Sequence, residues 1–301
     1  MDVSQRSLSI GGRRISLWSI ALGVILLLAL MLRLKGIHNP IIDHPGWRQG
    51  DESAIARNFA TLQYNPFFAQ TDYNGPPPNY VELELQIVPF VAATLYKIFG
   101  VHEIFGRLIS IVFSLGTVTL IAYFARWLFA DWIAGLLAAL LFAIMPGSFY
   151  YGRTFTPDTT MVFFFTAALY FVTRYLTEDK PLSWRGCAVS AGLLTLALLA
   201  KPVAAVALLP LAFVAIRRIR SGLPLRALAP LALLFAVPLA VLWGYDRFES
   251  SIAEWHWASG IMRLHVLPGV KAAFSSSAGF ALKWEYFKQI AGMLSTTMLG
   301  P

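Results

Sequence analysis

Two adjacent carboxylates, Asp51 and Glu52, follow an apolar run that is long enough to cross a lipid bilayer. A carboxylate at a membrane surface can take a proton from an attacking hydroxyl group or bind a metal ion. The distribution of charge along the chain places further acids, Glu82, Glu84 and Asp158, on the same side of the membrane. The sequence therefore predicts a group of acidic side chains at one membrane surface.

Basic side chains are predicted on that same side, at Arg57, Arg107, Arg153 and Lys201. Guanidinium and ammonium groups stabilise a phosphate leaving group, while a neighbouring carboxylate can serve as a base. Acids and cations together at a lipid boundary therefore favour a reaction on a phosphorylated lipid.

Each of these residues also has a purely structural interpretation. Asp51 could cap the helix predicted to start there, and Asp158 could cap the helix that follows Pro157. Lys201 precedes Pro202 and could mark a turn from which its long side chain reaches the interface. The sequence alone leaves these alternatives open.

No further catalytic motif is present in the sequence. The five histidines lack the short paired spacing of a zinc site, and the single Cys187 cannot form an intrachain disulfide or a thiolate cluster. No Gly-rich nucleotide loop and no Gly-x-Ser-x-Gly motif occurs. The sequence requires no cofactor, although Asp51 or Glu52 could hold a divalent cation together with a phosphate.

Hydrophobic residues make up 57% of the 301 residues and charged residues 13%, with a mean hydropathy of +0.63. One water-soluble core cannot bury so many apolar side chains, so the composition predicts an all-α polytopic membrane protein. The net charge of +8 comes from Lys and Arg in short connections between apolar runs, as in cytoplasmic loops. This pattern argues against a nucleic-acid partner.

Seven apolar runs are near the length of roughly 20 residues that a bilayer span needs. The first follows a basic cytoplasmic leader, residues 1–16, and is predicted to be an uncleaved signal anchor. The spans cover residues 17–32, 108–124, 133–145, 159–172, 188–200, 203–216 and 227–243. Residues 17–245 would form the transmembrane module. Residues 246–301 would form an external segment leading into a truncated helix over 284–299.

The first external loop, residues 36–107, is long and rich in aromatic residues and proline. Ile55, Phe59 and Leu62 recur at helical spacing and predict an amphipathic helix over residues 51–62 at the membrane interface. Such a loop is typical of a functional region rather than a simple connection.

Residues 85–99 form a shorter apolar stretch that contains a proline and a lysine. If this stretch crossed the bilayer, Asp158 would face the cytoplasm. A juxtamembrane or re-entrant placement instead puts the loops around Asp51, Asp158 and Lys201 on the external face.

The order of several motifs resembles the bacterial GT-C glycosyltransferases, in the family of protein O-mannosyltransferases and lipid A aminoarabinose transferase. The matching segments are residues 44–52 (HPGWRQGDE), 55–59 (IARNF), Glu84, 96–100 (YKIFG), Arg107 and 157–158 (PD). The resemblance covers roughly residues 17–216. It implies a GT-C transmembrane module of about seven spans, with juxtamembrane helices and an acidic motif in the first external loop.

By this resemblance Asp51 would be the catalytic base, with Glu52 beside it in the Asp-Glu motif of the family. Glu84 matches an acid that opens the second juxtamembrane helix, and Asp158 matches an acid at the external end of a later span. The resemblance thus assigns substrate contacts to these two acids.

One departure from the family pattern concerns the charge that binds phosphate. Many members have Lys-Pro after the acid of the second juxtamembrane helix, whereas Leu85 and Gln86 stand here. The positive charge would then have to come from Arg57, Arg153 or Lys201.

The resulting hypothesis is an inverting glycosyltransferase that moves a sugar from a polyprenyl-phosphate carrier to an acceptor at the outer face of the bacterial inner membrane. Asp51 would deprotonate the acceptor hydroxyl, and basic side chains would neutralise the departing phosphate. Trp47 and the aromatic loop that ends at Tyr80 would line the sugar site. The partners would be the lipid-linked donor, membrane lipids and a glycan, lipid or protein acceptor.

Two other classes of function compete with this hypothesis. A transporter or lipid flippase would place ionisable residues near the middle of its spans, whereas the predicted spans carry charges only near their ends. A non-catalytic lipid-binding partner with the same fold would fit the missing lysine.

Overall fold

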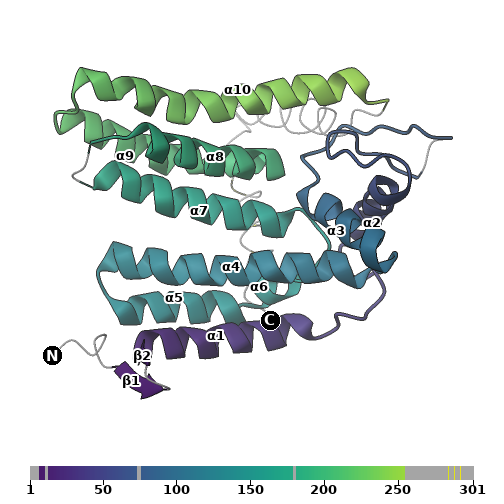
Figure 1. Ribbon diagram of the computed structural model, residues 1–301, viewed down its shortest axis with the longest axis horizontal. Coiled ribbons are helices and arrows are strands. Elements are labelled where there is room, and N and C mark those ends of the chain that lie inside the picture. The colour runs from purple at the N-terminus through teal and green to yellow at the C-terminus, as the bar shows by residue number, and fades with distance from the viewer. Residues whose placement is uncertain are drawn as a thin grey trace.

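The structure is a computed structural model that describes residues 7–10, 13–72, 76–178 and 181–254, with the single positions 284, 288 and 292. The longer helices lie side by side as a bundle, and the chain runs through them in alternating directions (Figure 1). These helices are α1 (Leu17–Leu34), α4 (Ile104–Phe129), α5 (Trp132–Ile144), α7 (Asp158–Thr177), α8 (Trp184–Ala200), α9 (Leu208–Arg220) and α10 (Leu228–Ile252).

Shorter elements occupy the ends of the bundle. At one end lie α2 (Gly46–Thr61), α3 (Ile87–Phe99) and α6 (Pro146–Tyr151) (Figure 1). At the opposite end an antiparallel hairpin of β1 (Ser7–Ile10) and β2 (Arg13–Ser16) leads into α1, a pairing that the sequence did not predict for the basic leader. Two 3-10 helices, η2 (Pro202–Ala207) and η3 (Leu225–Ala227), lead directly into α9 and α10.

The helices confirm an all-helical polytopic membrane protein. Five segments of the described chain are long and apolar enough to span a bilayer: α1, α4, α7, η2 with α9, and η3 with α10. The helices α3, α5 and α8 are apolar but shorter. The count of seven spans therefore stays a prediction, while the place of α3 beside α2 at the bundle end fits a juxtamembrane segment.

Exposed arginine-rich helix ends lie at the end of the bundle opposite α2 and α3. The last turns of α4, α7 and α9 all carry arginine and all point to that end (Figure 1). This arrangement matches the predicted cytoplasmic connections. Among the helices that start there, α1, α5 and α8 are capped by polar side chains, since Ser16, Asp131 and Ser183 each accept a hydrogen bond from a backbone N–H of the first turn.

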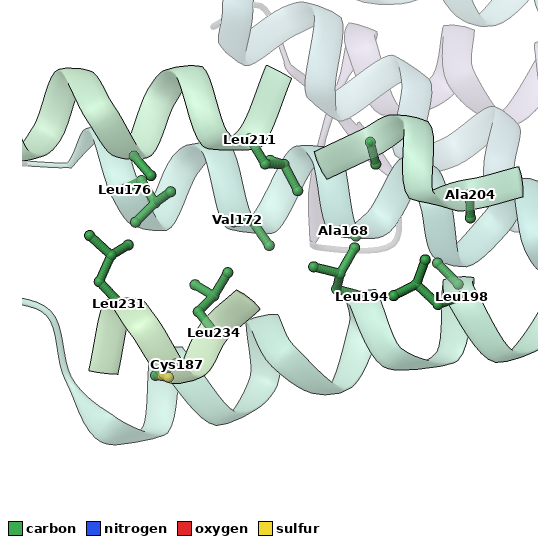
Figure 2. Packing of buried hydrophobic residues seen from close by; sticks show 13 residues of the cluster. Ala168, Val172, Leu176, Cys187, Leu194, Leu198, Ala204, Leu211, Leu231 and Leu234 are labelled. Atoms are coloured by element: carbon green, nitrogen blue, oxygen red, sulfur yellow. The ribbon is translucent and has the colours of Figure 1, made fainter. Parts of the chain in front are cut away.

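Two apolar cores hold the bundle together. The first lies between α1, α4 and α5 around Trp18, Ala29 and Val118. The second joins α7, α8, α9 and α10, and Figure 2 shows Leu194 and Leu234 among its members. Contact between α4 and α7 connects the two halves.

The helices of the first core lie close together because the residues at their contacts are small. A Cβ atom added at Gly135 of α5 would lie 2.6 Å from the carbonyl oxygen of Ala122 in α4. Small residues at helix contacts are what allows membrane helices to approach each other. Large apolar side chains on the outer faces, such as Val24, Met31 and Leu209, are exposed as lipid-facing residues would be.

The predicted further helix over residues 284–299 falls outside the described residues apart from three of its positions. The limits drawn at residues 16, 36, 107 and 245 also stay predictions, although α1 begins at Leu17 and α10 ends at Ile252.

Gly106 allows α4 to pack against the loop that precedes α7, because a Cβ atom at this position would overlap the ring of the buried Phe155. We expect Gly106→Ala to lower the free energy of unfolding by about 1–3 kcal/mol, the usual cost of overpacking. Gly192→Ala in α8 is the matched control, since nothing lies within 4 Å of its added Cβ. Thermal unfolding in detergent measures both, and equal midpoints would contradict the proposed packing.

Candidate active site at the end of the bundle

The acidic pair lies inside a helix and not at its start. Helix α2 begins at Gly46, five residues earlier than predicted, with Pro45 as its N-cap. Its start is fixed by the backbone, where the N–H of Gln49 donates to the carbonyl oxygen of Pro45 at 3.1 Å. The capping interpretation of Asp51 is therefore wrong, because the residue sits in the second turn of a helix.

The buried face of α2 differs from the predicted apolar stripe. Ile55 and Phe59 are buried as predicted, but Leu62 follows the helix and is 53% exposed. Glu52, which the pattern placed off the stripe, is fully buried together with Asn58. The helix therefore carries a buried carboxylate and an amide on its inner face.

Arg48 supplies the charge that makes this burial tolerable. Its Nη2 atom lies 2.9 Å from Oε1 of Glu52, one turn further along α2, and the same nitrogen forms an ion pair with Glu84. The sequence analysis missed Arg48, although its spacing of four residues from Glu52 is that of a helical ion pair. Arg48 is the guanidinium group that actually lies between two of the predicted site acids.

Glu84 is brought to this place by the backbone of its neighbour. The N–H of Leu85 donates to the carbonyl oxygen of Leu199 at 2.9 Å, near the end of α8. The side chain of Gln86 donates to the carbonyl oxygen of Glu84 at 2.7 Å. The segment before α3 is thereby fastened next to the residue that follows α8, which is Lys201.

Lys201 and Asp158 form the second charged pair of the site. The Nζ atom of Lys201 lies 2.6 Å from Oδ1 of Asp158, and the two side chains are 37% and 38% exposed. Asp158 is the first residue of α7, after Pro157 at the N-cap, so it is not the capping residue. Lys201 does lie at a turn, between α8 and η2, as its structural interpretation predicted.

Electrostatics link the two charged pairs. Burial lowers the pKa of Arg48, but the carboxylates of Glu52, Glu84 and Asp158 outweigh this effect and raise it overall. Four of the five predicted acids are therefore grouped, since Glu84, Asp158 and Asp51 all act electrostatically on Glu52. The structure brings these four together as the charge pattern predicted. The fifth, Glu82, accepts a hydrogen bond from Ser250 of α10 at 3.2 Å.

Burial also changes the protonation of Glu52. Loss of water raises the pKa of Glu52 to about 8; the charge of Arg48 opposes this rise, and Glu84, Asp158 and Asp51 add to it. Within the described part of the protein, Oε2 of Glu52 accepts no hydrogen bond. Glu52 can therefore hold a proton near neutral pH beside the candidate base.

Arg153 is occupied elsewhere. It is buried, its Nη1 atom donates to the carbonyl oxygen of Gly36 at 2.7 Å, and its Nη2 atom lies 3.4 Å from Asp43. Arg107 donates to the same carboxylate at 2.9 Å and to the carbonyl oxygen of Pro40 at 3.0 Å. These two arginines hold the loop between α1 and α2, and Asp43 at their centre is a residue that the sequence analysis did not select.

Arg57, Trp47 and Tyr80 are spread over the outer layer. Arg57 forms an exposed ion pair with Asp72 and thereby attaches the following loop to α2. The hydroxyl group of Tyr80 donates to Gln63 at 2.9 Å within that loop. Trp47 is 71% exposed on α2. The contacts of Arg57 and Tyr80 are those of loop packing, and the predicted sugar contacts of Trp47 and Tyr80 stay untested.

The described residues hold no group of three His, Cys, Asp or Glu side chains placed for a metal ion. Arg48 already occupies the space between Glu52 and Glu84. A divalent cation at the acidic pair remains a prediction.

An apolar bundle with paired acids and cations at one end defines a multi-pass membrane protein with a polar site at its boundary. A sequence model of the dolichyl-phosphate-mannose-protein mannosyltransferase family matches residues 86–243, which run from the start of α3 into α10. The match covers more than half of the 301 residues, and the chain belongs to this family.

This family is one of the GT-C glycosyltransferases, so the resemblance found in the sequence is confirmed and the protein is a glycosyltransferase of this type. No curated protein and no solved structure matches the chain. The matched region begins after Asp51, Glu52 and Glu84, so the roles of these residues stay predictions.

The raised pKa of Glu52 predicts how stability depends on pH. The folded protein holds this proton more tightly than the unfolded chain, so the contribution of Glu52 is lost as pH rises from the ordinary 4.5 to about 8. Glu52→Gln cannot ionise, and we expect its unfolding midpoint to rise relative to wild type across this window and then level off. Glu103→Gln, an exposed acid before α4, is the control. A difference that is constant with pH would contradict burial of an ionisable Glu52.

Removal of Arg48 should leave Glu52 and Glu84 without a counter-ion. We expect Arg48→Ala to cost about 3–5 kcal/mol of unfolding free energy, as for other broken buried ion pairs. Arg57→Ala breaks an ion pair whose partners are 48% and 43% exposed, and should cost less than about 1 kcal/mol. Thermal unfolding of the two variants measures this difference. Equal losses of unfolding free energy would show that the ion pairs of Arg48 stabilise the fold no more than the exposed pair of Arg57.

Proposed function

We propose that the protein is an inverting glycosyltransferase that moves a sugar from a polyprenyl-phosphate carrier to an acceptor hydroxyl group. The observation that supports this most directly is the grouping of the acids Asp51, Glu52, Glu84 and Asp158 with the cations Arg48 and Lys201. A family of glycosyltransferases needs a base and a cation next to the bilayer if its donor is lipid-linked, and this cluster offers both.

Asp51 is the proposed base. It lies on α2, half-buried, next to the fully buried Glu52. In the proposed step Asp51 takes the hydroxyl proton of the acceptor while the acceptor oxygen attacks the anomeric carbon. The bond from that carbon to the phosphate oxygen breaks, and the phosphate leaves with the electron pair. Attack opposite the leaving group inverts the anomeric centre.

Lys201 is the proposed partner of the departing phosphate. Of the three cations considered for this role, Arg57 is bound to Asp72, and Arg153 is buried against Gly36 and Asp43. Lys201 is over one-third exposed and has one described carboxylate partner, Asp158. Its ammonium group can turn toward a phosphate without leaving a buried charge behind.

Glu52 and Arg48 complete the proposed site without touching the reacting atoms. A protonated Glu52 limits the negative charge near Asp51, because Arg48 then balances the single carboxylate of Glu84. The phosphate of the donor therefore does not meet the unbalanced negative charges of Asp51, Glu52 and Glu84 together.

The family description names mannose, dolichyl phosphate and protein as donor sugar, carrier and acceptor. Of these three properties, we assign only a lipid-phosphate carrier for the donor sugar to this chain. We place the reaction at the external face of a bacterial inner membrane, because the arginine-rich helix ends lie at the other end of the bundle. A glycan, a lipid or a protein could supply the acceptor hydroxyl.

A transporter is less well supported by the placement of charge. The charged residues of the five candidate spans described all lie within the first two or last two turns of their helices, including Asp246, Arg247 and Glu249 near the end of α10. Coupled transport uses ionisable groups near the middle of the bilayer. A non-catalytic lipid-binding partner remains the second candidate, and the experiment below separates it from an enzyme.

We expect Asp51→Asn to lower turnover by about 10²–10⁴-fold, the usual contribution of a general base, with an unchanged unfolding midpoint. The assay follows release of polyprenyl phosphate from a panel of polyprenyl-phosphate sugars, mannose included, in vesicles with an envelope extract as the source of acceptor. Lys201→Ala should weaken donor binding as well as turnover, and Glu103→Gln is the control for loss of an exposed acid.

Near-normal turnover by folded Asp51→Asn would rule out its role as base. Wild-type protein that binds the donor but releases no polyprenyl phosphate would favour the non-catalytic partner.

A further inference from the structure

A fully buried arginine lies at the external end of α1. Arg33 donates to Ser114 Oγ at 2.7 Å and to Ser148 Oγ at 2.9 Å, and it also binds the backbone carbonyl oxygens of Ala29 and Ala143 at 3.1 and 3.2 Å. All these partners are neutral. None of the ion pairs found among the described residues includes Arg33.

Such an arrangement is costly unless a negative charge comes near. A buried cation loses its hydration, and neutral oxygen atoms replace only part of it. An anion held close to Arg33 would compensate for more of the lost hydration free energy. The surroundings of Arg33 therefore indicate where an anionic group could bind.

A cavity lies directly beside these contacts. It has a volume of about 370 Å³ and lies between α4, α5, α6 and α7. Its wall is mainly apolar, with Phe142, Met161 and Val162, and its polar end contains Ser114 and Ser148. A volume of this size is within the usual range of about 300–1,000 Å³ for small-molecule sites.

The two serines connect the cavity with the buried cation. Each hydroxyl oxygen accepts a hydrogen bond from Arg33, so each hydroxyl hydrogen can be donated to a group in the cavity. A hydroxyl group polarised by a cation in a low-dielectric interior is a stronger donor. Gly152 keeps the contact tight, since a Cβ atom there would lie 2.5 Å from Ser114 Oγ and 2.8 Å from Arg33 Nε.

Asp158 also lines the cavity and would by itself repel an anion. Its carboxylate is paired with Lys201 at 2.6 Å, which offsets that charge at the cavity wall. The polar groups together favour a negatively charged head, while the rest of the wall favours an apolar chain.

We propose that this cavity binds a single-chain lipid with a phosphate monoester head. The head lies at the Ser114–Ser148 end, with Arg33 behind it, and the chain lies along the apolar wall. The site requires no glycosyl transfer and does not include Asp51, although it shares Asp158 with the candidate active site. A prenyl phosphate and a lysophosphatidic acid share this chemistry.

The test is native mass spectrometry of the full chain in detergent, titrated with farnesyl phosphate, with lysophosphatidic acid and with zwitterionic lysophosphatidylcholine. We expect saturable binding of the two anionic lipids. The double variant Ser114→Ala/Ser148→Ala should bind them at least tenfold more weakly. Ser190→Ala, a buried serine of α8, is its matched control.

Val162→Phe fills the apolar part of the cavity and should also weaken binding at least tenfold, whereas Val189→Phe on the exposed face of α8 should not. Val162→Phe decides the question alone if the double serine variant fails to fold. Tighter binding of farnesyl phosphate would identify the prenyl lipid as the ligand, and tighter binding of lysophosphatidic acid would identify a phospholipid.

Wild-type affinity in both cavity variants would overturn the proposal, as would equal binding of the zwitterionic lipid. Binding should persist in Asp51→Asn, so that failure of this site can be told apart from failure of the proposed transfer reaction.

Discussion

A guanidinium group buried at a membrane boundary must find oxygen atoms in the protein, and this requirement organises one whole end of the bundle. Arg107 gathers carbonyl oxygens of the loop after α1 together with the carboxylate of Asp43. Arg33 joins α1 to α4 and α6 through serine hydroxyl groups. Arg48 connects α2 with the segment before α3. Each arginine contacts segments that are distant in the sequence, so the loops between the spans acquire fixed positions although they have few strands or helices of their own.

The same requirement explains why the site is polar and yet rigid. Glu52 is buried because Arg48 lies one turn away on the same helix, and Glu84 is held by both a side-chain ion pair and its neighbour's backbone bond. Lys201 and Asp158 stay partly exposed and keep freedom to move. The candidate site thus combines a buried acid held within α2 with a more exposed ion pair between Lys201 and Asp158.

Local pattern in the sequence was sufficient for the apolar helices and for the grouping of four acids at one end, since apolar length and the position of lysine and arginine are properties of single segments. It failed where the outcome depends on a partner far away in the chain. The ion pair between Arg48 and Glu84 depends on the backbone bond that ties Leu85 to Leu199. The use of Arg153 for a loop depends on Gly36 and Asp43. Hydropathy treats every charged residue as exposed, so it could not reveal Arg33 and Arg107 as buried residues or Arg48 as a half-buried one.

The backbone bond between Leu85 and Leu199 has a consequence for amino-acid exchange around it. Because it uses only main-chain atoms, exchange of either side chain leaves it intact, with proline at position 85 as the exception. The distance between the residue at position 84 and the residue that follows α8 is thereby kept independent of which amino acids stand there. The charged groups at these two places can therefore be exchanged without altering the backbone frame that presents them.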